Sequence, residues 1–156
     1  MVSRVGGEGG VVDLGRALMA VYVSLYKRPG VLVLTDKAFV LYDKQSLKRL
    51  LPVVGDALRI LDEKAAAEIS RLEGKELVKA LKEHGFKPRS LLLYSDVRRV
   101  EIEKGLMGSI KLKIATTKED VEFRLGTFPG GPSRDEQRSR LVSKLRELGI
   151  PVTERA

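Results

Sequence analysis

Cysteine, tryptophan and asparagine are absent from this chain of 156 residues, and histidine occurs once, as His84. Without cysteine the chain can form no disulfide, offer no thiol nucleophile and supply no thiolate to zinc or an iron–sulfur cluster. A Ser-His-Asp triad would have to use His84, yet no serine stands in the Gly-x-Ser-x-Gly motif of a nucleophile elbow. One imidazole and scattered carboxylates also make a poor metal site. We therefore expect no catalytic activity, no metal and no cofactor.

Two further shortages concern the environment of the protein. Asparagine is missing and glutamine occurs only twice, whereas charged residues make up 32% of the chain. Few heat-labile residues together with many charges are typical of proteins from thermophiles. No apolar run approaches the roughly 20 residues that a membrane span needs. Residues 1–15 also lack the basic segment followed by an apolar core that is typical of a signal peptide. Together these features predict a heat-adapted cytoplasmic protein.

Positive charge is what the chain has in excess. Lysine and arginine number 29 against 21 aspartates and glutamates, which gives a net charge of +8. The excess is spread along the chain, and aromatic residues reach only 5%, which leaves few stacking platforms for single-stranded nucleic acid. Nucleic-acid binding through dispersed Lys/Arg clusters is therefore an alternative rather than the favoured interpretation.

The length and the 43% of hydrophobic residues predict one folded domain. Five glycines within residues 1–15 predict a flexible leader, because glycine loses much backbone entropy when it is ordered. We interpret residues 16–150 as the domain and residues 151–156 as a tail.

The first part of the domain has the composition of strands. Residues 17–26, 31–34 and 38–42 are rich in apolar residues, and the polar segments 27–30 and 35–37 between them predict turns. These features indicate an antiparallel meander.

The pattern changes to a helical period over residues 44–90. Apolar residues recur there at steps of three or four, and Gly85 stands where a helix commonly ends in a left-handed residue. This segment is therefore predicted to be a helical block between two β regions.

The second β region alternates with a period of two over residues 100–103, 111–114 and 121–125. Pairing about the intervening turns places Lys113 between Glu101 and Glu122, and Lys111 between Glu103 and Arg124. Opposite charges across strands stabilise a sheet, so we interpret Glu101 and Glu103 as part of a solvated charge ladder rather than as an acid–base or metal pair.

The chain ends in a predicted helix. Ser133 to Glu136 matches a capping box, an apolar stripe follows as far as Leu148, and Gly149 and Pro151 end the helix. A structural helix is the simpler interpretation, although an anion could sit at its start beside Arg134 and Arg138.

Residues 30–36, followed by 38–42, are similar to the second and third strands of pleckstrin-homology-like domains of the GRAM and bacterial PH type. Residues 92–100 look like the segment that introduces the next strand of that superfamily. The resemblance covers about residues 17–43 and 91–148. It implies an α+β fold: a bent antiparallel sheet or partly open barrel with a C-terminal capping helix. The helical block at 44–90 departs from the family's pattern, and we interpret it as a helical insertion.

The resemblance further implies a non-catalytic binding or adaptor module that engages a protein partner or an acidic membrane surface. Members that bind phosphoinositides use basic residues around the turn between the first two strands, where Lys27 and Arg28 stand here. Their further basic positions in the second strand are not matched, since Val31, Leu32 and Val33 stand there. The candidate ligand-binding residues are Lys27, Arg28, Arg98, Arg99, Arg134 and Arg138.

Overall fold

The computed structural model describes residues 3–4, 15–25, 28–43, 63–127 and 132–155. Its strands are β1 (Ser3–Arg4), β2 (Ala17–Leu25), β3 (Arg28–Thr35), β4 (Ala38–Asp43), β5 (Lys87–Leu93), β6 (Val97–Lys104), β7 (Ile110–Thr116), β8 (Asp120–Leu125) and β9 (Val152–Arg155). The helices are α1 (Glu63–Arg71), α2 (Gly74–Glu83) and α3 (Arg134–Glu147), with single 3-10 turns at η3 (Tyr94–Asp96) and η4 (Leu106–Gly108).

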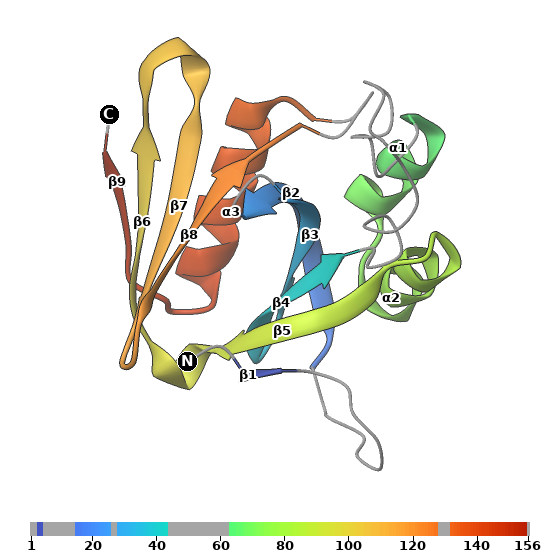
Figure 1. Ribbon diagram of the computed structural model, residues 1–156, viewed down its shortest axis with the longest axis horizontal. Coiled ribbons are helices and arrows are strands. Elements are labelled where there is room, and N and C mark those ends of the chain that lie inside the picture. The colour runs from blue at the N-terminus through green and yellow to red at the C-terminus, as the bar shows by residue number, and fades with distance from the viewer. Residues whose placement is uncertain (1–2, 5–14, 26–27, 44–62, 128–131, 156) are drawn as a thin grey trace.

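The strands belong to one sheet in the order β1-β5-β4-β3-β2-β8-β7-β6-β9. Two antiparallel meanders, β2 to β5 and β6 to β8, meet where β2 lies beside β8 (Figure 1). The α+β class, the antiparallel sheet and the C-terminal helix are thus confirmed. No helix in the described part of the chain is long and apolar enough to cross a membrane.

The first meander confirms the predicted strands but corrects two boundaries. Arg28, Pro29 and Gly30, predicted to lie in a turn, are the first residues of β3 and pair with residues 23–25. Residues 87–90, predicted to end the helical block, belong to β5 and pair with β4. Proline is tolerated at the start of a strand. The strand at Lys87-Pro88-Arg89-Ser90 was not predicted because these residues do not alternate between polar and apolar.

The predicted turn at 35–37 is confirmed, and the Thr35 hydroxyl accepts the N–H groups of Lys37 and Ala38 there.

The second meander has the predicted register. Glu101 faces Lys113 and Glu103 faces Lys111 across β6 and β7, while Lys113 faces Glu122 and Lys111 faces Arg124 across β7 and β8. The ion pair itself runs diagonally, from Lys113 Nζ to Glu103 Oε1 at 3.2 Å.

The helical insertion gives the first meander a core on each face. Val31, Val33 and Val40 pack with Ile69 of α1 and Leu77 of α2, whereas the intervening apolar residues of β3 and β4 pack with the second meander and α3. Figure 1 shows α1 and α2 on one side of β3 and β4, with α3 and β6 to β8 on the other. This two-sided burial explains why residues 31–34 of β3 and 38–42 of β4 are continuously apolar, while β6 to β8 alternate.

Helix α3 joins the two meanders through a buried amide. The Ser133 side chain accepts the Glu136 N–H at 3.1 Å, as the capping motif predicts, and Leu141, Val142 and Leu145 enter the core. One turn before them, Gln137 is only 2% exposed. Its Oε1 accepts the Tyr22 N–H at 3.0 Å, and its Nε2 donates to the Gly126 carbonyl. The Gln137 amide thus makes one acceptor and one donor hydrogen bond, as a backbone peptide group would, at the point where β2 and β8 separate.

Both ends of the described chain contain short strands, which differs from the prediction. Residues 151–156 were predicted to be a tail, yet β9 pairs in parallel with β6. Within the predicted leader, Ser3 and Arg4 pair with β5; residues 5–14 lie outside the described residues, as do residues 44–62 of the predicted helical block.

Leu77→Ala tests whether the helical insertion is part of the cooperative unit. Leu77 is fully buried, so the substitution is expected to lower the free energy of unfolding by about 2–5 kcal/mol. Val78→Ala, at the neighbouring position that is 40% exposed, is the control and should lower it by less than about 1 kcal/mol. Urea unfolding followed by circular dichroism measures both. A separate early transition in Leu77→Ala would show that α1 and α2 unfold independently of the sheet.

Candidate functional site

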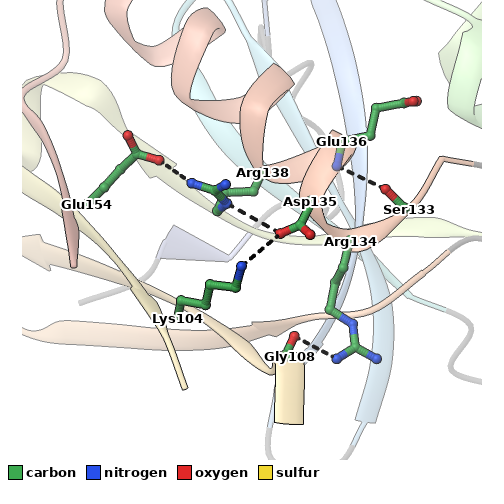
Figure 2. A network of polar contacts seen from close by, with 8 residues as sticks. All are labelled: Lys104, Gly108, Ser133, Arg134, Asp135, Glu136, Arg138 and Glu154. Atoms are coloured by element: carbon green, nitrogen blue, oxygen red, sulfur yellow. Dashed lines mark hydrogen bonds and ion pairs between the residues drawn. The ribbon is translucent and has the colours of Figure 1, made fainter. Parts of the chain in front are cut away.

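The predicted anion site at the start of α3 is occupied by the protein's own groups. Arg138 Nη1 lies 2.5 Å from Glu154 Oε1 of β9, and its Nε lies 3.8 Å from Asp135 Oδ1. Arg134 Nη1 donates to the Gly108 carbonyl at 2.9 Å, and Lys104 Nζ lies 3.6 Å from the same Asp135 carboxylate (Figure 2). These contacts tie α3 to β9 and to the β6–β7 turn, which favours the structural interpretation of this helix start.

The other predicted residues do not gather into one site. Arg99 Nε lies 3.5 Å from Glu101 Oε1, an oxygen that also contacts Arg155 Nη2 at 3.4 Å. Arg98 is exposed beside it at the start of β6. Arg28 is described only by its backbone, which pairs with Leu25, and Lys27 lies outside the described residues.

A hollow of about 890 Å³ lies instead between the start of β2 and helix α2. We call it the α2 hollow. Four cationic side chains line it: Arg16, Lys75, Lys79 and Lys82. Its other lining residues are Gly15, Ala17, Glu73, Gly74, Glu76 and Val78.

Local structure accounts for this arrangement. In α2 the buried residues Leu77, Ala80 and Leu81 face the sheet, so lysines at steps of four and three residues fall on the opposite, solvent-facing side. The backbone of Arg16 is held by the turn between β3 and β4. Its N–H donates to Asp36 Oδ1 at 2.9 Å, and its carbonyl accepts the Asp36 N–H at 3.1 Å.

The β3–β4 turn that holds Arg16 is itself anchored by Tyr94. The Tyr94 hydroxyl donates to the Thr35 carbonyl at 2.5 Å, and its ring meets Phe39 edge-on at 5.1 Å. Burial, with a smaller contribution from the nearby Asp36 carboxylate, raises the pKa of Tyr94 above its ordinary value. The phenol therefore stays protonated, and remains a donor, up to strongly alkaline pH.

The positive charge in the α2 hollow is not neutralised by ion pairs within the part of the chain that the structure describes. Among the described residues, no carboxylate lies within ion-pair distance of Arg16, Lys75, Lys79 or Lys82. Glu73 and Glu76 line the same hollow without pairing with them. Four cations against two carboxylates leave a net positive charge in a concave surface, which attracts anionic groups.

A second hollow, of about 570 Å³, lies between α1 and α3 over residues 18–20 of β2. Its cations are already engaged. Arg140 pairs with Glu136 at 3.9 Å, Lys144 pairs with Glu147 at 3.2 Å, and Arg71 Nε donates to the Ala67 carbonyl. This difference distinguishes the α2 hollow as the candidate binding site.

The α2 hollow was not predicted from the sequence, because the predicted sites lay at turns, at adjacent arginines and at the start of the last helix. The signal was present as spacing: positions 75, 79 and 82 form one side of a helix whose opposite side is apolar. The contribution of Arg16 could not be read from the sequence, since it depends on how β2 lies beside α2.

Two further observations concern His84 and the carboxylates. His84 ends α2, and its Nε2 lies 3.9 Å from Glu68 Oε2 of α1. In the described part of the chain, no three His, Asp or Glu side chains are grouped so that they could hold a metal ion. No protein-family model matches the chain, and a comparison with curated proteins finds no match either.

A double-mutant cycle tests the structural role of Arg138. Arg138→Ala and Glu154→Ala are each expected to destabilise the fold, with a coupling energy of roughly 0.5–1 kcal/mol because both groups are partly solvated. Urea unfolding of the wild type, the two single variants and the double variant measures this coupling. Strict additivity of the two substitutions would show that the Arg138–Glu154 pair contributes nothing.

Proposed function

We propose that the protein is a non-catalytic binding module of pleckstrin-homology-like type, and that its α2 hollow holds an acidic segment of a protein partner. The fold supports this proposal at the level of architecture. Two antiparallel meanders are followed by a C-terminal helix, in the order that the resemblance implies. The helical insertion between β4 and β5 supplies the binding surface.

The observation that carries the proposal is the set of cations in the α2 hollow that have no ion-pair partner in the described part of the chain. Of the residues that the sequence suggested as ligands, Arg99 and Arg138 contact carboxylates of the protein itself, and Arg134 contacts a backbone carbonyl. Arg16, Lys75, Lys79 and Lys82 have no such partner among the described residues, and they surround one concave space. Carboxylates of a partner would complete these contacts.

The composition of the hollow favours a polypeptide over a nucleic acid. Its lining, as far as the structure describes it, contains no aromatic side chain on which bases could stack. Glu73 and Glu76 would repel a continuous phosphate backbone, whereas an acidic peptide also carries N–H groups that these carboxylates can accept. Its concave shape also fits a chain segment better than a flat bilayer.

Lys75→Glu/Lys79→Glu tests the proposal. Binding to immobilised polyglutamate at low salt is expected to weaken about tenfold or more, because two attractive contacts become repulsive. Lys64→Glu/Lys118→Glu makes the same change of net charge at exposed positions outside the hollow. This control should reduce binding less than threefold. Surface plasmon resonance measures the affinities, and thermal unfolding confirms that each variant is folded.

Equal losses in the two double variants would contradict the proposal, because the effect would then come from net charge alone. The same variants are also tested against a 20-base-pair duplex DNA. If the hollow variant loses DNA retention and keeps its polyglutamate binding, the nucleic-acid alternative is correct. A steep fall of DNA binding between low and physiological salt would accompany that result.

A further inference from the structure

Strand β2 has an open edge along part of its length. It pairs with β3 throughout, but with β8 only through Val23 and Ser24. At the next position, the Tyr22 N–H donates to Gln137 Oε1 and the Tyr22 carbonyl accepts the Gly126 N–H. Residues of β2 before Tyr22 have no strand beside them on this edge in the described part of the chain.

The register of β2 shows which peptide groups face the open edge. In an antiparallel pair, residues that exchange hydrogen bonds with the neighbouring strand alternate with residues whose N–H and C=O point away from it. Ser24 lies opposite Pro29, which has no N–H, and Tyr22 bonds on the side away from β3. Ala20 follows in the same unbroken register, opposite Val33. Its N–H and carbonyl therefore also point away from β3, and no group of the described residues hydrogen-bonds to them there.

These peptide groups lie at the floor of the hollow of about 570 Å³ between α1 and α3. Ala20 lines this hollow together with Leu18 and Met19, and it is only 6% exposed. Backbone groups without a partner are rare and costly at such a buried position. The cations of this hollow are engaged, but the hydrogen-bonding groups of its floor have no partner in the described part of the chain.

The walls of the hollow restrict what can reach this edge. Ser70 and Leu72 come from the end of α1 and the residues after it, and Ser139 and Ser143 come from α3. Figure 1 shows β2 running between α3 on one side and α1 and α2 on the other. The edge strand of a second folded copy would collide with these helices, whereas a single extended chain fits between them. Because the cations of the walls are already engaged, they favour an uncharged chain.

We infer that an uncharged, extended segment of a partner protein adds as a strand to the open edge of β2. Its backbone N–H and C=O complete the hydrogen bonds of Ala20, and its apolar side chains pack on Leu18 and Leu72. In this kind of recognition the main chain supplies the affinity, and the alternate side chains supply the specificity.

This inference goes beyond the proposed function, because strand addition does not require the α2 hollow to be occupied. The two hollows nevertheless adjoin. Residues 15–17 line the α2 hollow, residues 18–20 line the second hollow, and Glu73 lines both. A partner segment with an acidic stretch next to an uncharged extended stretch would therefore occupy both in series.

The peptide acetyl-Thr-Val-Thr-Val-Thr-Val-amide is the probe, because it is uncharged and its β-branched residues favour an extended backbone. Two derivatives carry N-methyl groups, one on the three valines and the other on the three threonines. Alternate N–H groups of a strand point to opposite sides, so only one of the two sets faces β2. That derivative is expected to bind about tenfold more weakly than the parent peptide, and the other to stay within about threefold of it.

Nuclear magnetic resonance measures these affinities up to millimolar peptide, and also reports on the protein. On saturation with the parent peptide, the Ala20 amide proton is expected to move downfield and to exchange more slowly with solvent, because it gains an acceptor. The Val21 amide, which pairs with Leu32 of β3, is the internal control and should change little in either respect.

Two substitutions block the hollow from its opposite walls. Ser70→Trp fills it from α1, and Ser143→Trp, at an exposed position that tolerates a large side chain, fills it from α3. Each is expected to weaken peptide binding about tenfold or more. Lys64→Trp, at an exposed position of α1 outside the hollow, is the control and should change it less than about twofold. Thermal unfolding confirms that each variant is folded.

Binding to polyglutamate separates this inference from the proposed function. Ser143→Trp should keep it, and Lys75→Glu/Lys79→Glu should keep the binding of the Thr-Val peptide. No binding of this peptide, equal affinities of the two N-methyl derivatives, an unmoved Ala20 amide or full affinity in both blocked variants would each overturn strand addition and leave the α2 hollow unaffected. A dimer in sedimentation that Ser143→Trp abolishes would overturn it too, and would assign the edge to a second copy of the chain.

Discussion

The joint between the two meanders is the constraint on which the rest of the molecule depends. Strands β2 and β8 share only two residue pairs, Val23 with Leu125 and Ser24 with Arg124. Beyond them, the buried amide of Gln137 accepts one backbone N–H and donates to one backbone carbonyl. An unpaired polar group at such a buried site would cost about 1–3 kcal/mol. One glutamine of α3 thereby satisfies both strands at the point where they separate, and fixes the helix between them.

Covering both faces of the first meander determines where binding surfaces can form. Because α1 and α2 shield the side of β3 and β4 that faces away from the second meander, these two strands have no exposed face left for a ligand. The cations that line the α2 hollow lie instead on the outer side of α2 and at Arg16, just before β2.

The sequence determined the elements whose signals are local and left open those that depend on distant contacts. Alternation in residues 100–125 predicted the register of β6 to β8, and Ser133 predicted the start of α3. Strand β9 escaped prediction because four residues carry little pattern and its partner is more than 40 residues away. Adjacent arginines such as Arg98 and Arg99 looked like a site, but Arg99 pairs with Glu101 two residues further along β6, and Arg138 pairs with Glu154 of the distant strand β9. Charge clusters in a sequence do not show which cations stay free.

The short strand β9 has a consequence for the association of copies of this chain. An unpaired outer strand exposes a row of N–H and C=O groups on which another polypeptide can build intermolecular sheet. Here β9 covers the flank of β6, and its own outer residues include Glu154 and Arg155, which are bound by Arg138 and Glu101 respectively. A charged four-residue strand is a poor template for fibril growth. The apolar strands of the sheet can therefore be concentrated in its interior, where they do not promote aggregation.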